Sequence, residues 1–212
     1  MVNVALVRRV GVLFGVAVAG LAAADNPAVV PVPKKDAGWV KQHESFVARA
    51  EKGDVDVLFV GDSITAGWNG AGKKVWDERF AGWKPANFGI GGDRTEHVLW
   101  RVTEGKELDG IDPKVIVLMI GTNNGPQTAE QVAAGVAAIV AEFRKQKPSA
   151  KVLLLGIFPR AGGIEKDVPV APADKVGAKS RDVNAIIAKL DDGKSVKYLD
   201  IGAKFLDAQG GL

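Results

Sequence analysis

The 212-residue sequence lacks cysteine and contains only two histidines, His43 and His97. Without cysteine the chain can form no disulfide framework, no thiolate metal site and no thiol nucleophile. Two histidines are too few for a histidine-rich metal cluster. Thiol chemistry and a zinc-finger type of metal centre are therefore excluded before any motif is considered.

A strong charge of one sign is also missing, although the formal net charge is +3. The first 24 residues contain Arg8 and Arg9 and no acidic residue, and the rest of the chain is close to neutral. No basic stretch is typical of a nucleic-acid footprint, so we expect no nucleic-acid partner. The remaining composition, 47% hydrophobic and 25% charged, is that of an ordinary globular domain.

Residues 1–24 are typical of a secretory signal peptide. Arg8 and Arg9 form a positive flank, Val10–Ala24 is apolar, and three alanines precede Asp25. A stretch of about 15 apolar residues is too short to cross a bilayer core of about 30 Å as a helix. We therefore predict export to a periplasm or out of the cell, with no stable membrane insertion after cleavage. An uncleaved anchor or a buried helix is the alternative.

Beyond this segment, residues 25–36 are rich in proline and predict a linker or extended arm, and a helical pattern follows over Ala37–Lys52. Short apolar runs then alternate with helical patterns, for example a helix starting at Thr128 with Gln131 as its capping box. We predict two more helices, one starting at Asp93 with Glu96 and one over Asp182–Leu190. The expected strands are Val55–Val60, Ala86–Ile90, Val115–Ile120, Val152–Phe158 and Val196–Ile201.

This alternation predicts a three-layer α/β fold with a doubly wound parallel sheet of five strands, for which we expect the flavodoxin-like order 2-1-3-4-5. In such sheets ligands bind beyond the carboxyl ends of the strands, where the strand order reverses. Ser63 follows the first expected strand, Asn123 the third, and Gly91-Gly92 the second. A hydroxyl, a carboxamide and flexible backbone are thus predicted to face one crevice.

These groups suit acyl transfer. A serine oxygen can attack a carbonyl, and the negative oxygen of the tetrahedral intermediate needs donors fixed in advance, each contributing about 3–4 kcal/mol. The amides of Ser63 and Gly92 and Nδ2 of Asn123 could serve. Each residue also has an ordinary structural interpretation: Ser63 as a helix N-cap, Asn123 and Gly92 as turn residues. Arg160 could line the acyl or sugar pocket, or form an ion pair.

The three blocks resemble those of the SGNH (GDSL-type) hydrolases. They are Gly61-Asp62-Ser63-Ile64, Asn87-Phe88-Gly89-Ile90-Gly91-Gly92-Asp93 and Gly121-Thr122-Asn123-Asn124. The wider run to Arg101 is most similar to the branch that holds the catalytic subunits of platelet-activating-factor acetylhydrolase. The resemblance implies Ser63 as nucleophile, with Gly92 and Asn123 as oxyanion-hole donors. It also implies hydrolysis of short-chain, acetyl esters without metal or organic cofactor, on a small-molecule or carbohydrate substrate.

One block of that family is missing. No Asp-x-x-His occurs in the sequence, so the general base and the carboxylate that orients it have no counterpart. The family's terminal helix would also be absent, which would leave apolar sheet surface uncovered. We therefore expect residues 37–212 to be an esterase domain that is C-terminally incomplete, either a fragment or truncated reading frame, or a pseudoenzyme. His97 and His43 are not predicted to replace the base.

Two other functions remain as alternatives. The missing block favours a catalytically inactive, carbohydrate-binding SGNH-like module. The fold alone would also suit a flavodoxin-like binder of a nucleotide or flavin.

Overall fold

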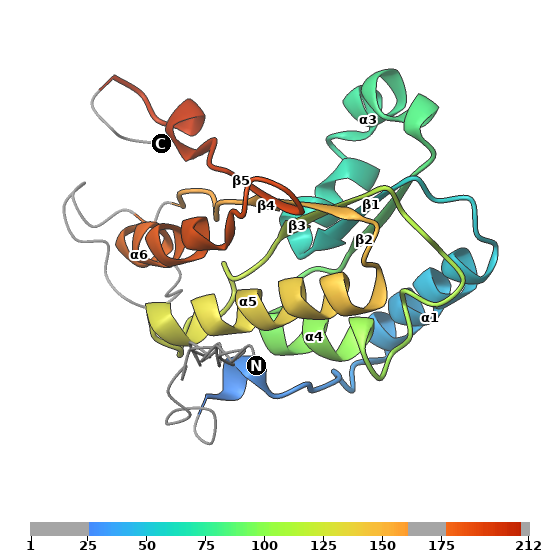
Figure 1. Cartoon of the computed structure of the whole chain (residues 1–212), viewed down its shortest axis with the longest axis horizontal. Coiled ribbons are helices and arrows are strands. Elements are labelled where there is room, and N and C mark those ends of the chain that lie inside the picture. The colour runs from blue at the N-terminus through green and yellow to red at the C-terminus, as the bar shows by residue number, and fades with distance from the viewer. Residues whose placement is uncertain (1–25, 161–176, 209–212) are drawn as a thin grey trace, which may run out of the picture.

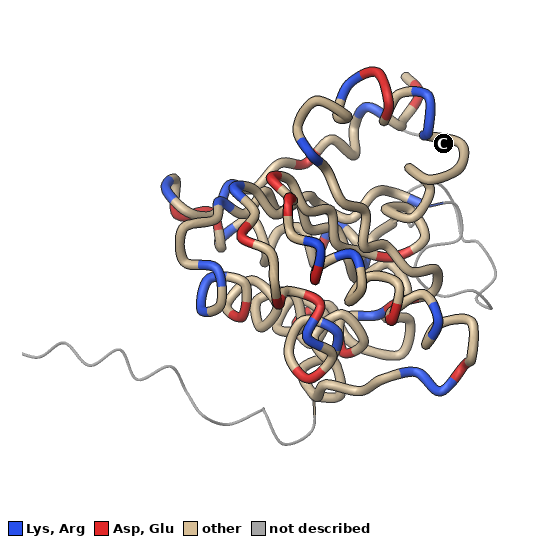
Figure 2. The backbone as a smooth tube through the Cα atoms, turned by 90° about the vertical axis from the view of Figure 1, so that its right-hand side faces the viewer, with Lys and Arg blue, Asp and Glu red and all other residues tan. Residues whose placement is uncertain are grey.

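The computed structural model describes residues 26–160 and 177–208, and it shows a layered α/β domain (Figure 1). The predicted signal peptide, residues 1–24, lies outside the described residues. Within the two described ranges, no helix is long and apolar enough to cross a membrane. Lys and Arg are interspersed with Asp and Glu along this part of the chain (Figure 2).

Five parallel strands form one sheet in the order β2-β1-β3-β4-β5, which confirms the predicted topology. The strands are β1 (Val57–Gly61), β2 (Pro85–Gly89), β3 (Val115–Met119), β4 (Lys151–Leu155) and β5 (Val196–Leu199). The fourth was expected to reach Phe158, but it ends at Leu155. Beyond that point the Asn184 side chain takes over the pairing, because its Oδ1 accepts from the Ile157 amide (2.8 Å) and its Nδ2 donates to the Ile157 carbonyl (3.0 Å).

Helices cover both faces of the sheet, with α3 on the opposite face from α1, α4, α5 and α6 (Figure 1). The helices are α1 (Ala37–Glu51), α2 (Ser63–Ala66), α3 (Lys73–Arg79), α4 (Thr95–Val102), α5 (Ala129–Gln146) and α6 (Ala178–Ile187). On the face covered by α1, α4, α5 and α6, alternate strand residues such as Leu58, Ile116 and Leu118 are fully buried. Because strand side chains alternate between faces, these residues form one side of the core.

The opposite face is covered only in part. Trp76, on α3, and Phe80 pack on Phe59 with ring centroids 4.8 and 5.4 Å away. Next to them lies a hollow of about 650 Å³, lined by apolar side chains that include Val117 and Leu153. Among the described residues no α-helix follows β5, only a 3-10 turn over Gly202–Phe205. The lining of the hollow shows that part of this apolar sheet face is left uncovered by the described residues.

Helix starts were predicted with mixed success. The capping box of α5 is confirmed, because the Thr128 hydroxyl accepts from the Gln131 amide (3.2 Å) and the Gln131 side chain accepts from the Thr128 amide (2.9 Å). The predicted start of α4 at Asp93 is wrong. The helix begins at Thr95, and His97 Nδ1 accepts from the Arg94 amide (3.0 Å) in place of the expected pair. Likewise α6 begins at Ala178, four residues before the predicted Asp182.

Residues 26–36, the predicted linker or arm, pack against α4 and α5. The segment opens with a 3-10 turn over Pro27–Val29 that Asn26 caps, and Ala28 in this turn is fully buried. Asn26 Nδ2 also donates to the Gln131 carbonyl on α5 (3.2 Å). The segment then runs along the domain to α1 (Figure 1).

Candidate active site

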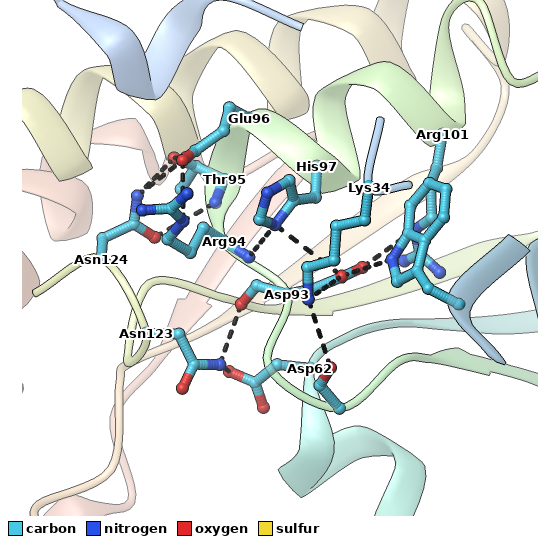
Figure 3. A network of polar contacts seen from close by, with 12 residues as sticks. Lys34, Asp62, Asp93, Arg94, Thr95, Glu96, His97, Arg101, Asn123 and Asn124 are labelled. Carbon is cyan, nitrogen blue, oxygen red and sulfur yellow. Dashed lines mark hydrogen bonds and ion pairs between the residues drawn. The ribbon is translucent and has the colours of Figure 1, made fainter. Parts of the chain in front are cut away.

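The loops that follow β1, β2 and β3 meet at one place, as their positions in the sheet predict. Asn123 Nδ2 donates to the Asp93 carbonyl (2.9 Å) and lies 3.5 Å from Asp62 Oδ2. A Cβ placed on Gly91 would lie 3.9 Å from Ser63 Cβ. Figure 3 shows Asn123 facing both Asp62 and Asp93. The structure thus brings the neighbourhoods of Ser63, Gly92 and Asn123 together.

Ser63 is the first residue of α2 and is exposed to solvent. The N-cap of this helix is Asp62, whose Oδ1 accepts from the Ile64 amide (2.9 Å). The alternative interpretation of Ser63 as the cap is therefore wrong. Its hydroxyl makes no hydrogen bond to another described residue, so it is available to a ligand at the carboxyl edge of the sheet.

The carboxyl-terminal half of β2 holds α2 in place. Asn87 Nδ2 donates to the Thr65 carbonyl (2.9 Å), and Asn87 Oδ1 accepts from the Gly89 amide (3.0 Å). A Cβ at Gly89 would collide with the backbone of Thr65 and Ala66. The glycine therefore allows the end of β2 to touch α2, and the contact fixes the turn that presents Ser63.

The backbone conformation at residue 92 favours glycine. Its φ is +73°, in the left-handed region that side chains disfavour. Lys34 Nζ lies 3.4 Å from the position that a Cβ on Gly92 would take, which is ordinary van der Waals contact. The positive φ therefore accounts for a glycine at this position.

Asp62 is a buried carboxylic acid beside Ser63. Burial raises its pKa to about 6, and the Asp93 carboxylate adds to this rise, whereas the Ile64 amide and Arg160 oppose it. The Arg160 charge thus acts on this carboxyl group, whereas pocket lining and an ion pair, the two roles that the sequence left open for Arg160, stay predictions. The site thus combines an exposed hydroxyl with a carboxyl group that titrates near neutral pH.

A buried network surrounds Asp93 and was not predicted from the sequence. Asp93 Oδ1 accepts from Trp39 Nε1 (2.7 Å), and Oδ2 lies 3.2 Å from Arg101 Nε. Burial raises the pKa of Asp93, and the Arg101 charge and the Trp39 hydrogen bond oppose that rise. A signal was present in the sequence, because Arg101 follows Val98 by three residues and so lies on the apolar face of the predicted helix.

Neither histidine is placed as a base for Ser63. His97 Nδ1 accepts from the Arg94 amide, and burial together with Lys34 and Arg94 lowers its pKa to about 3, so the ring is neutral near pH 7. His43 lies in α1, where its Nδ1 pairs with Glu107 Oε1 (2.8 Å). Among the described residues, neither ring hydrogen-bonds to Ser63.

The loops beyond β1, β2 and β3 bring a serine, a glycine turn and an asparagine together at the carboxyl edge of a doubly wound parallel sheet, an arrangement that suits the carboxylic ester hydrolases. Comparison with known proteins gives the family. The model of the GDSL-like Lipase/Acylhydrolase family matches residues 59–212, and the chain belongs to this family. It is an acylhydrolase by family, and its sheet order and helical layers are those of the SGNH hydrolases.

Individual proteins that are similar to this chain support the family assignment. The chain is 40% identical over 192 residues to the platelet-activating factor acetylhydrolase IB subunit alpha2 of Rattus norvegicus, covering 88% of this chain and 79% of the relative. Its fold is similar to that of a Streptococcus pneumonia protein assigned as a platelet activating factor (TM-score 0.60, 20% identity, 82% and 81% of the two chains). It is also similar to that of Est24, a carbohydrate acetylesterase from Sinorhizobium meliloti (TM-score 0.52, 18% identity, 70% and 85%).

Proposed function

We propose that the protein cleaves short-chain esters, acetyl esters first of all, with Ser63 as nucleophile. The observation that carries this proposal is the position of Ser63: exposed, not used as a helix cap, and next to the Gly91–Gly92 turn. The donors for the oxyanion are the amides of Ser63 and Gly92 and Nδ2 of Asn123.

In this proposal, Ser63 Oγ bonds to the acyl carbon while its proton passes to a base other than the two histidines, which later gives that proton to the departing alcohol. The carbonyl oxygen becomes an oxyanion and accepts hydrogen bonds from the three donors. The intermediate then collapses, the alcohol departs with a proton, and an acyl-serine remains. Water attacks this acyl-serine in the same way and releases the carboxylic acid, which restores the Ser63 hydroxyl.

The names of two similar proteins support acetyl as the acyl part of the substrate. The rat relative is named as an acetylhydrolase of platelet-activating factor, and Est24 as a carbohydrate acetylesterase. The acyl part is common to both names, whereas the alcohol part differs. We therefore propose an acetyl ester with a small-molecule or carbohydrate alcohol.

One observation favours the second candidate, a carbohydrate-binding module without turnover. The two histidines of the sequence are bonded to Arg94 and Glu107, and within the described residues neither ring hydrogen-bonds to Ser63. A serine hydrolase without its base retains only about 10³–10⁴-fold catalysis over water. This candidate predicts that acetylated oligosaccharides bind without being cleaved.

The test measures release of p-nitrophenol from p-nitrophenyl acetate by the wild-type chain, by Ser63→Ala and by the matched control Ser45→Ala. Ser45 is exposed in α1, where its hydroxyl donates to the Gln42 carbonyl. We expect Ser63→Ala to reduce turnover to the buffer rate and Ser45→Ala to leave it unchanged. Equal turnover by wild type and Ser63→Ala above the buffer rate would reject Ser63 as nucleophile. Buffer-level rates in all three, together with oligosaccharide binding by calorimetry, would favour the binding module.

A further inference from the structure

Lys34 carries a positive charge to the back of the proposed oxyanion hole. Its Nζ lies 3.3 Å from Asp93 Oδ1 and 3.4 Å from the Gly91 carbonyl oxygen, to which it donates. The side chain is 24% exposed and lies beside Asp93 in Figure 3. Lys34 belongs to the segment 26–36, which precedes the residues 59–212 that match the family model.

The contact with Gly91 matters because of peptide geometry. The Gly91 carbonyl and the Gly92 N–H belong to one planar peptide unit, and the described residues contain no cis peptide bond. In a trans peptide the C=O and N–H point in opposite directions. A cation that holds the carbonyl oxygen therefore aims the Gly92 N–H away from Lys34. It also polarises the amide, which strengthens the N–H as a donor.

The lysine is itself held in place. Asp93, its ion-pair partner, is fixed by Trp39 Nε1 at 2.7 Å and by Arg101 Nε at 3.2 Å. Arg101 is in turn anchored by two hydrogen bonds to the Phe88 carbonyl, at 3.0 and 2.9 Å. A long, flexible side chain is thus positioned by groups that are fully buried or nearly so.

The backbone that carries Lys34 is anchored as well. The Val32 amide donates to the Glu96 carbonyl on α4 (3.2 Å), and the Thr95 hydroxyl donates to the Ala28 carbonyl (3.0 Å). Lys34 therefore approaches Gly91 from a segment tied to the first turn of α4. That turn directly follows the Gly91–Asp93 loop. The first turn of α4 therefore anchors both the segment and the loop.

We propose that Lys34 is a positioning residue that orients and polarises the Gly92 N–H for the oxyanion. The proposal rests on the proposed function, in which Gly92 is an oxyanion-hole donor. Lys34 touches neither the nucleophile nor the reacting carbon in this account, and it acts only through the Gly91–Gly92 peptide.

The test compares Lys34→Met, which keeps the length of the side chain without its charge, with Lys34→Arg, which keeps the charge. Lys35→Met is the matched control, because Lys35 is the exposed neighbour in the same segment. Removal of a whole oxyanion donor costs about 10²–10³ in kcat, so loss of its polarising partner should cost about 10-fold. We expect this loss in kcat for Lys34→Met with KM nearly unchanged, partial recovery in Lys34→Arg, and wild-type kinetics in Lys35→Met.

A second readout does not depend on turnover. The amide ¹⁵N chemical shift of Gly92 reports the hydrogen bond on the preceding carbonyl, and we expect it to move upfield in Lys34→Met but not in Lys35→Met. An unchanged Gly92 shift, or an unchanged kcat in an active enzyme, would overturn the proposal. If the wild type shows no Ser63-dependent turnover, the proposed function fails. The Gly92 shift then decides by itself whether Lys34 orients this peptide.

Discussion

Replacement of Arg101 by methionine should destabilise the fold more than any other change of a single charge considered in this protein. Arg101 is fully buried between two carboxylates, with Asp93 Oδ2 at 3.2 Å and Glu107 Oε2 at 3.4 Å. Its guanidinium carbon also lies 5.8 Å from the centre of the Phe46 ring. Methionine fills a similar volume but leaves both carboxylates buried without this cation.

The size of the destabilisation follows from the loss of the buried Arg101 charge. Removal of one partner from a buried ion pair costs about 3–5 kcal/mol, because the charge left behind is desolvated and unpaired. For a domain of this size, such a loss lowers the melting temperature by about 6–20 °C. The loss of unfolding free energy in Arg101→Met should be smaller near pH 4 than at pH 7. Without Arg101, the pKa of Asp93 in the folded state is raised above its value in the unfolded chain. The free-energy cost of burying the charged Asp93 carboxylate therefore develops as the pH rises above that unfolded value.

The assay is urea unfolding followed by tryptophan fluorescence, with Arg144→Met as the matched control. Arg144 forms an exposed ion pair with Asp192 (2.8 Å), and its side chain is 48% exposed, so this substitution should cost less than about 1 kcal/mol. Glu107→Gln added to Arg101→Met should recover part of the loss. If Arg101→Met costs no more than Arg144→Met, the reasoning about the buried charges is wrong.

Two more predictions concern Asp62 and Thr128. The folded pKa of about 6 for Asp62 lies above the ordinary 3.8, so its burial penalty grows as the pH rises from about 4 to about 6 and reaches about 3 kcal/mol. Wild type should therefore lose stability relative to Asp62→Asn over this window in urea titrations, and a constant difference at all pH values would contradict the shift. Thr128→Ala removes the α5 cap and should cost about 1 kcal/mol in thermal unfolding. Thr128→Ser should keep most of that stability, and equal losses in both variants would refute the cap.

The sheet was predictable because its signals are local. A run such as Val115–Ile120 is apolar throughout, as a parallel strand covered on both faces requires, and the strand forms over Val115–Met119. The alternation of strands and helices predicted a doubly wound parallel sheet, whereas the order 2-1-3-4-5 came from the similarity to flavodoxin-like sheets. The meeting of the Ser63, Gly91 and Asn123 loops followed in turn, because parallel strands end at the same edge.

The start of α4 shows where local reasoning failed. Asp93 and Glu96 have the spacing of a capping box, yet neither caps the helix. The Asp93 carboxylate is taken by Trp39, 54 residues earlier in the sequence, and by Arg101. Glu96 turns to Arg94, with an ion pair of 2.9 Å. Such partners depend on the folded arrangement of α1 and α4, which no periodicity within residues 93–102 encodes.

Asp93 couples the two proposed oxyanion donors that come from different loops. Its carbonyl oxygen accepts from Asn123 Nδ2, and its side chain holds Lys34, which in turn holds the Gly91 carbonyl. The orientations of the Asn123 and Gly92 donors therefore depend on one buried residue and on the Arg101 charge that keeps it in place. A change that frees the Asp93 side chain should disturb both donors together. Consequently, the effects of Arg101→Met and Lys34→Met on kcat should be far from additive, whereas those of Arg101→Met and Lys35→Met should add.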